Sequence, residues 1–337
     1  MNSEYDRIIY EEPEIFIDKG SMLGNNIRCF NLPNDNFGVV NFDGRLALCI
    51  EGAGKNAWAC LECLEREKCK KIKMCPGASI ICNNRCYQNN TMTLNTRRKV
   101  FKNFLASQSS AFPDLMIGAL NNQVLEKNIH HFRIHSLGEF YDKEYFEKWV
   151  YIAAQVPDIQ FTAYTKCFRI LDDFCRSGKQ VSGNMKFMLS IMPDSLYGTR
   201  FEYGGNKKQL LEKKEKNKQV IRRIIKNYNA DIYLTTYMDN YELILQNGED
   251  KEFPGWDVKC CSLHRHEVCS RCFKNREAGY CYEISENPRI IIEPIRTTSG
   301  KADYRSDLKR IKEYNKKMAE LVEQDISLDM GSRETLY

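Results

Sequence analysis

"FRIHSLGEFYDKEYFEKWVYIAAQVPDIQFTAYTK" (residues 132–166) predicts a strand, a helix and a second strand. Runs rich in β-branched and aromatic residues, at 132–135 and 159–165, flank a segment whose apolar side chains recur at helical spacing over 142–156. Asp142 can cap the start of that helix. A strand, a helix and a strand repeating at about 27 residues are typical of βαβ units, which build a parallel sheet or barrel.

The same alternation continues toward the C-terminus. Further β-rich runs occur at 186–191, 231–237 and 290–295, and helical stretches separate most of these runs. The five strands visible from residue 130 onward are too few for a complete eight-stranded barrel. The sequence therefore predicts an α/β fold with an open or partial (β/α) barrel.

Before residue 130 the pattern is different. "FGVVNFDGRLALCI" (37–50) predicts a β-hairpin, because Asp43-Gly44 between two apolar runs supplies the positive φ angles of a type I′ turn. Helical spacing covers residues 94–127, with a break near Pro113, and a terminal helix is predicted over 302–325.

Composition and charge are ordinary. The chain has 337 residues, of which 42% are hydrophobic and 28% charged, and its start is acidic. No apolar run approaches the ~18 residues of a membrane span, so we expect a cytoplasmic protein without membrane contact. The net charge of +5 is mild, but residues 207–229 hold nine Lys and Arg against two Glu. This segment is either the solvated outer face of a helix or a nucleic-acid contact through 207–226.

Fifteen cysteines are unusual for a chain of this length, and eleven of them fall in two short bands. Disulfides are rare in a reducing compartment, whereas metal coordination needs thiolates that converge. The bands are Cys60, Cys63, Cys69, Cys75, Cys82 and Cys86, and then Cys260, Cys261, Cys269, Cys272 and Cys281.

"CPGASIICNNRCY" (75–87) holds the most informative cysteines of the first band. Cys75, Cys82 and Cys86 can supply three thiolates to a [4Fe–4S] cluster and leave one iron without a protein ligand. Such an iron can bind the amino and carboxylate groups of S-adenosylmethionine. Zinc and the absence of any metal are the alternatives. A fourth thiolate from Cys60, Cys63 or Cys69 would close the cluster and leave only electron transfer or a structural role.

The second band predicts a closed four-ligand site. Cys269-x2-Cys272 has a spacing shared by zinc ribbons and iron–sulfur loops, and Cys261 and Cys281 complete a set of four, with Cys260 as a substitute for Cys261. The spacing does not separate a second cluster from structural zinc.

Polar residues follow the predicted strands, where α/β proteins bind their ligands. "SLGEF" (136–140) follows the first strand. Its glycine would let a ligand approach the backbone, and the carboxylate of the adjacent Glu139 can hold an ammonium group. Tyr164, Thr165 and Lys166 close the second strand, and Asp194 and Tyr237 follow two later ones. Together they predict a lined pocket.

The stretches 75–87 and 132–166, with the C-terminal cysteines, resemble the phage gene-product-88 family. That family is similar in pattern to radical S-adenosylmethionine proteins, which are built on a partial (β/α) barrel. The resemblance covers roughly residues 70–285 and implies a cluster on Cys75, Cys82 and Cys86. It also implies that Gly138 and Glu139, with Ser136, contact S-adenosylmethionine. The cysteine spacing C-x6-C-x3-C differs from the C-x3-C-x2-C of radical enzymes.

Three functions follow from these features. The first is a radical S-adenosylmethionine-type enzyme with an unknown substrate contacted by Tyr164 and Lys166, which would need a flavodoxin- or ferredoxin-type electron donor. The second is a phage or mobile-element accessory protein with structural metal sites that binds nucleic acid or a host protein. The third is an electron-transfer or redox-sensing protein with closed clusters.

The expected organisation has four parts. Residues 1–93 hold the hairpin and the cluster loop, and residues 94–250 hold the partial barrel. Residues 251–285 form a cysteine-rich metal-binding element, and residues 286–337 hold the last strand and the C-terminal helix.

Overall fold

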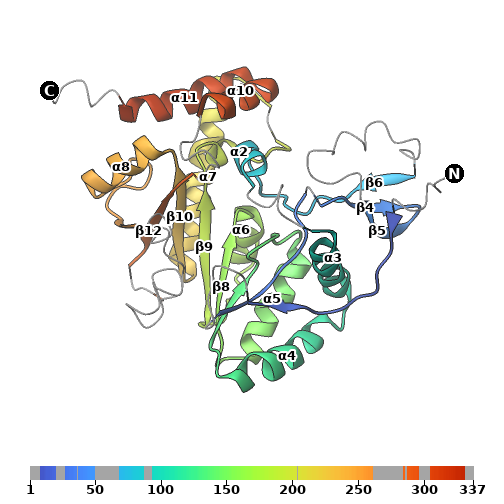
Figure 1. Ribbon diagram of the computed structural model, residues 1–337. Helices are drawn as coiled ribbons and strands as arrows, with labels where there is room; N and C mark the ends of the chain where they lie inside the picture. The colour runs from blue at the N-terminus through green and yellow to red at the C-terminus, as the bar shows by residue number, and fades with distance from the viewer. Residues whose placement is uncertain are drawn as a thin grey trace. The chain divides into compact units, whose positions relative to one another are not determined.

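The computed structural model describes residues 8–19, 27–35, 37–49, 68–86, 93–202, 204–260, 284, 287–295 and 304–330 (Figure 1). The chain forms two compact units. The first comprises residues 1–21, 25–76 and 86–161, and the second comprises 22–24, 77–85 and 162–337. Segment 77–85 therefore belongs to the second unit, although the first unit precedes and follows it in sequence.

The predicted hairpin is confirmed in the first unit. Strands β4 (Val39–Phe42) and β5 (Arg45–Cys49) pair antiparallel, with Phe42 opposite Arg45. Asp43 (φ 49°) and Gly44 (φ 83°) both have the positive φ that a type I′ turn requires. Strands β1 (Ile8–Ile9) and β6 (Cys69–Lys71) extend the hairpin to a four-stranded sheet in the order β1-β5-β4-β6.

A second group of strands and helices completes the first unit. Strand β3 (Ile27–Phe30) pairs parallel with β7 (His131–Ile134) and antiparallel with β2 (Ile17–Asp18). The helices are α3 (Leu94–Gln108), α4 (Phe112–Gln123), η3 (Leu125–Lys127) and α5 (Lys143–Gln155). The predicted cap is confirmed, because Asp142 Oδ1 accepts a hydrogen bond from Tyr145 N at 2.8 Å. Trp149 of α5 packs against the rings of Phe30, Phe112 and Phe132.

The second unit alternates parallel strands with helices, as the sequence predicts. Its strands pair in parallel from β9 to β10, from β10 to β12 and from β12 to β11. The strands are β8 (Gln160–Thr165, which the unit boundary crosses), β9 (Met185–Ile191), β10 (Ala230–Thr236), β11 (Asp257–Cys260) and β12 (Arg289–Pro294). The helical elements are α2 (Ile80–Asn84), α6 (Phe168–Arg176), η4 (Ser195–Tyr197), α7 (Lys207–Asn227) and α8 (Met238–Asn247).

The larger sheet is mostly parallel and open. Its hydrogen-bonded strand order is β11-β12-β10-β9-β8-β7-β3-β2, so that β11 and β2 are edge strands among the described residues. The fold is thus mixed α/β. The described strands do not close into a barrel.

The predicted C-terminal helix is two helices, α10 (Tyr304–Tyr314) and α11 (Lys316–Met330). The break falls at Asn315, whose side-chain oxygen accepts a hydrogen bond from Met318 N at 3.1 Å and so begins the second helix. The two helices lie beside α2 and α7 in Figure 1. Met192, Tyr237 and Ile295 come directly after β9, β10 and β12, and they share one buried apolar cluster with residues of α2, α10 and α11. The chain itself therefore covers the carboxyl ends of these strands.

Candidate functional site

Cys75 and Cys86 lie in the first unit, beside the loop that follows β3. Asn34 Nδ2 donates a hydrogen bond to Cys86 Sγ at 3.3 Å. Asp35 Oδ1 accepts hydrogen bonds from Met74 N at 2.7 Å and from Cys75 N at 3.3 Å. Asn34 and Asp35 are both buried. Two adjacent polar residues after one strand thus contact both ends of the segment from Cys75 to Cys86. The cysteine spacing singled out neither of them.

Cys82 lies in α2 of the second unit. Cys82 N donates to the capping residue Ser79 Oγ at 3.2 Å, and Ile81 N donates to Asp194 Oδ2 at 2.9 Å. Asp194 follows β9 and is fully buried, and this burial raises the pKa of its carboxyl group to about 6, although hydrogen bonds from Ser79 and Ile81 oppose the shift. Asp194 therefore supports α2 rather than facing an open pocket.

Lys166, a predicted substrate contact, touches the segment that leads into α2. A methyl group on Gly77 would lie 2.4 Å from both the carbonyl carbon and the carbonyl oxygen of Lys166. Only a glycine allows this close backbone approach. The structure thus brings the end of β8 against a residue that is two positions beyond Cys75 in the sequence.

Tyr164, the other predicted substrate contact, lies on a mixed face of the second unit's sheet, where it packs against the buried cluster of Met188, Tyr233 and Ile291. Side chains alternate along a strand, so the register of β9, β10 and β12 determines which side chains share each face of the sheet. One face carries Phe187 and other apolar side chains and packs against Tyr228, which follows α7. On the other face the Tyr233 hydroxyl donates to Glu293, and the Tyr164 ring packs on the Tyr233 ring at 5.1 Å.

A buried charge cluster lies on the same mixed face, near the amino ends of the strands. Asp231 Oδ2 is 2.8 Å from Lys186 Nζ and 3.1 Å from Arg289 Nη2. All three side chains are buried. Buried charges are expensive unless they are paired, so a face that carries this cluster is not an ordinary apolar core face.

Ser136, Gly138 and Glu139, the predicted S-adenosylmethionine contacts, lie at the carboxyl end of β7. Ser136 N donates to Asn31 Oδ1 at 3.0 Å, as does Leu137 N. Gly138 has a φ of 92°, and a methyl group there would lie 2.6 Å from Leu32 Cβ. Glu139 is 5% exposed, and its Oε1 accepts a hydrogen bond from the adjacent Phe140 N at 2.9 Å. The close packing between the ends of β3 and β7 thus explains by itself why position 138 is a glycine. The Glu139 carboxylate contacts the backbone N–H of the next residue.

His135 directly precedes this motif and is strained. It is a non-glycine residue with a φ of 65°, and its Nε2 lies 2.7 Å from the Tyr145 hydroxyl. Burial, together with the charge of Arg133, lowers the pKa of its imidazole to about 3. A neutral buried histidine in the left-handed region marks a strand end under constraint. The sequence signals this only through its position between a strand and a glycine.

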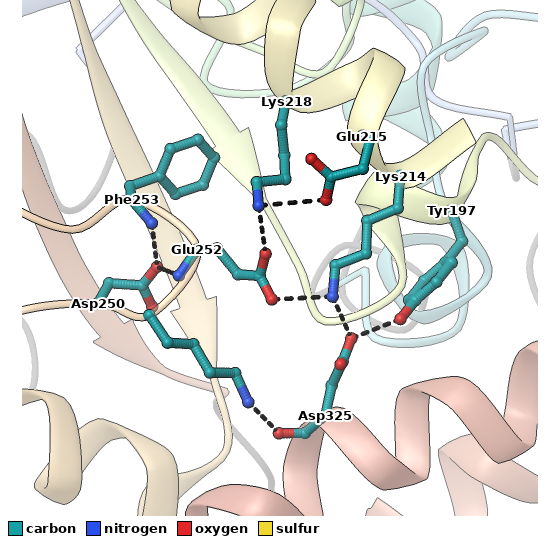
Figure 2. Close-up of polar contacts among 9 residues, drawn as sticks. Tyr197, Lys214, Glu215, Lys218, Asp250, Glu252, Phe253 and Asp325 are labelled. Carbon is teal, nitrogen blue, oxygen red and sulfur yellow. Dashed lines mark hydrogen bonds and ion pairs between the residues drawn. The ribbon is translucent and has the colours of Figure 1, made fainter. Parts of the chain in front are cut away.

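The protein itself engages some of the cations of the basic helix α7 (Figure 2). Lys214 Nζ lies 2.8 Å from Glu252 Oε1 and 2.9 Å from Asp325 Oδ2. Lys218 Nζ lies 3.0 Å from Glu252 Oε2, and Arg223 pairs with Asp172. Burial alone would lower the pKa of Lys214, but the hydrogen bonds with the two carboxylates reverse this effect and raise it. The exposed cations of α7 are Lys207, Lys208, Lys216, Arg222 and Lys226.

Cys75, Cys82 and Cys86 offer three thiols, which is the ligand type that iron–sulfur clusters use. The described cysteines form no disulfide with one another, and Cys75, Cys82 and Cys86 are each half-buried. Within the described ranges, no group of three or more His, Cys, Asp or Glu side chains could hold a metal ion. A cluster places each thiolate on a different iron, so its ligands lie farther apart than those of one ion. The Asn34 hydrogen bond to Cys86 is of the kind that tunes cluster thiolates.

The remaining predicted ligands, Cys261, Cys269, Cys272 and Cys281, lie outside the described residues, as do Cys60 and Cys63. No helix of the described ranges combines the length and apolarity needed to cross a membrane.

Comparison with known proteins gives one result. The family model "Gene product 88" matches residues 55–275, about two thirds of the chain. The match includes the whole first cysteine band and the segments 136–140 and 164–166. Of the second band it includes every cysteine except Cys281. No curated protein and no solved structure matches the chain. The resemblance read from the sequence motifs is therefore confirmed at the level of the phage family: the chain belongs to the gene product 88 family.

Proposed function

We propose that the protein is an iron–sulfur enzyme of the radical S-adenosylmethionine type, built on a partial (β/α) barrel, with a [4Fe–4S] cluster on Cys75, Cys82 and Cys86. The supporting observation is that the segments carrying these thiols are tied by specific hydrogen bonds to residues after strands. Asn34 and Asp35 hold the segments of Cys86 and Cys75, and Asp194 holds the helix of Cys82. Loops at the carboxyl ends of parallel strands are where α/β proteins carry their chemistry.

The roles of the other residues follow from this arrangement. A cluster with one iron open to solvent supplies the reductive cleavage of S-adenosylmethionine. Glu139 would hold the ammonium group of that molecule by turning from Phe140 N, with Ser136 and Gly138 beside it. Tyr164 and Lys166 would contact the unknown substrate. Cys261, Cys269, Cys272 and Cys281 would hold a second cluster or zinc, and the electrons would come from a flavodoxin- or ferredoxin-type donor in the cytoplasm.

The test is an assay on protein purified without oxygen. Iron and sulfide are measured first, and dithionite and S-adenosylmethionine are then added and 5′-deoxyadenosine is measured. The proposal predicts iron, sulfide and formation of 5′-deoxyadenosine. An intact, reduced cluster that forms none would contradict the enzyme proposal. Glu139→Gln should weaken S-adenosylmethionine binding and leave the iron content unchanged, with Glu147→Gln on the surface of α5 as the control.

A second function has a separate basis in α7. Five cations of this helix remain exposed, which suits a non-enzymatic accessory protein that binds nucleic acid through 207–226 and uses its metal sites for structure. Binding to a mixed-sequence duplex should then weaken steeply as salt rises. Lys216→Gln combined with Arg222→Gln should reduce that slope by about 2. A duplex that stays unbound at low salt would exclude this function.

A further inference from the structure

We propose that α10 and α11 form a latch that fixes Cys82, with Asp307 as its positioning residue and Asp325 as its second attachment point. The inference rests on the proposed function, because that function makes Cys82 a cluster ligand. It adds a supporting element to that site: the C-terminal helices determine how firmly one of the three thiols is held.

Helix α2 needs such support because it is short. It has five residues, and an isolated helix of fewer than about 12 residues is marginal in water. Ser79 and Asp194 fix only its first turn. The position of Cys82, in the middle of the helix, therefore depends on what holds the other end.

Two side chains hold that end. Arg200 Nη1 donates to Asn83 Oδ1 at 2.7 Å, and Asp307 of α10 makes the larger number of contacts. Its two carboxylate oxygens each accept from Arg85 Nε at 3.0 Å, and Oδ1 also accepts from Asn84 Nδ2 at 2.9 Å. The Tyr237 hydroxyl, directly after β10, donates to Oδ2 at 3.0 Å. The Asp307 side chain is 0% exposed. One buried carboxylate thus joins the end of α2, the end of β10 and α10.

Apolar contacts follow the same path. Ile80 and Ile81 of α2 pack in one buried cluster with Ile311 of α10 and with Met318 and Val322 of α11, and the half-buried Cys82 packs against that cluster. Removing the C-terminal helices would therefore uncover the apolar side of α2 as well as break its polar contacts.

Asp325 fastens α11 at a more exposed point, shown in Figure 2. Its Oδ2 accepts from Lys214 Nζ at 2.9 Å and from the Tyr197 hydroxyl at 2.6 Å, and its backbone carbonyl accepts from Lys251 Nζ at 2.5 Å. The Asp325 side chain is 27% exposed. Water and salt screen this attachment more than the buried one at Asp307, so it is the weaker of the two.

The test measures how fast each thiol of the full-length, iron-free protein reacts with a small alkylating reagent, read peptide by peptide by mass spectrometry. Cys175 of α6, which is also half-buried and in the same unit, is the internal reference. Asp307→Asn removes the charge that pairs with Arg85 and keeps the volume. It should raise the rate at Cys82 about tenfold, and Asp325→Ala about threefold, because local opening exposes the thiol. Glu313 and Glu320 are exposed carboxylates of α10 and α11. Glu313→Gln and Glu320→Gln should leave the reaction rates of both Cys82 and Cys175 unchanged.

An unchanged rate at Cys82 in both variants would overturn the latch, and so would an equal rise at Cys175, which would mean general loosening. If Asp307→Asn fails to fold by circular dichroism, Asp325→Ala carries the test. Because the protein is iron-free, the result does not depend on cluster assembly. A wild type that takes up no iron would overturn the proposed function separately.

Discussion

Different chemistry holds two segments of the molecule, residues 136–138 after β7 in the first unit and helix α2 in the second. In the first unit, the neutral amide of Asn31 accepts hydrogen bonds from Ser136 N and Leu137 N, and Gly138 packs directly on Leu32. In the second unit, the buried carboxylates of Asp194 and Asp307 hold α2. A neutral amide carries no charge to desolvate, whereas a buried carboxylate depends on its partners. The first arrangement is therefore fixed, and the second can respond to a change in charge.

The largest expected effect is steric and belongs to the first unit. Gly138→Ala places a methyl group 2.6 Å from Leu32 Cβ at a φ of 92°. This combination of strain and overlap should lower the free energy of unfolding of that unit by about 3 kcal/mol. Urea unfolding, with hydrogen exchange to assign the loss to the first unit, measures it.

Gly118→Ala is the control for that substitution. It lies inside α4, and a methyl group there meets nothing within 4 Å. It should raise stability by up to about 1 kcal/mol, because alanine is the better helix former. Equal effects of the two variants would show that the end of β7 does not need its glycine.

The next effect compares the two kinds of acceptor directly. Asn31→Ala leaves Ser136 N and Leu137 N without their acceptor, and Asp194→Ala does the same to Ile81 N. Each should cost about 2 kcal/mol, since unsatisfied buried donors are expensive. Hydrogen exchange should speed up at 136–137 in the first variant and at 80–81 in the second. Asn122→Ala, exposed on α4, should speed up neither, and loss of protection throughout both units would contradict the local roles.

Acid should affect the two units in opposite directions. His135 has a pKa of about 3 in the folded protein, below its ordinary 6.5. Its contribution to the free energy of unfolding is therefore complete above pH 6.5 and is lost as the pH falls toward 3. Asp194 has a folded pKa of about 6, above its ordinary 3.8, so ionisation costs stability above pH 6, and this cost is relieved as the pH falls toward 3.8. Each of the two groups should change the free energy of unfolding by about 2 kcal/mol over about 1.5 pH units.

The pH contrast is measured by urea unfolding of the wild type, His135→Asn and Asp194→Asn from about pH 7 to about pH 4.5. Compared with the wild type, His135→Asn should gain relative stability on acidification, and Asp194→Asn should lose it. Asparagine suits position 135, because it tolerates a positive φ. Slopes of the same sign for both variants would contradict the contrast.

The smallest effect separates two lysines of α7. Lys214→Met removes the partner of Glu252 and Asp325 and should cost about 1 kcal/mol, because both contacts are partly open to water. Lys216→Met, on the exposed side of the helix, should stay within about 0.5 kcal/mol. Thermal unfolding at two salt concentrations measures both. A larger loss of stability for Lys216→Met than for Lys214→Met would mean that the ion pairs of Lys214 contribute little to stability.

Local sequence signals predicted much of the fold. Asp43-Gly44 defined the hairpin, Asp142 marked the start of α5, and the five apolar runs are strands β7, β8, β9, β10 and β12. Strand β3 escaped prediction, because its four residues include Arg28 and its pairing with β7 joins parts of the chain about 100 residues apart. The break at Asn315 depends on a single cap within a continuous helical pattern.

The candidate site was predicted only in part, for a physical reason. The spacing singled out Cys75, Cys82 and Cys86 as predicted ligands, but the groups that contact their segments in the structure come from distant positions. Asp35 is 40 residues from Cys75 in the sequence, and Asp307 is 222 from Arg85. A lone aspartate in a polar stretch carries no local signal of such a partner. Likewise, the nine cations of α7 look alike in sequence, and only the fold distinguishes Lys214 from Lys216.

The central claim is that three thiols of one loop gather around iron, and it is tested most directly by iron and sulfide analysis with electron paramagnetic resonance on anaerobic protein. The wild type is compared with the triple substitution of Cys75, Cys82 and Cys86 by serine, and with Cys175→Ser as the control. We predict that the reduced wild type and the control show the same [4Fe–4S] signal, and that the triple variant loses this signal together with about four iron atoms per chain. Equal iron and an unchanged signal in the triple variant, or a wild type without iron and sulfide, would contradict the account.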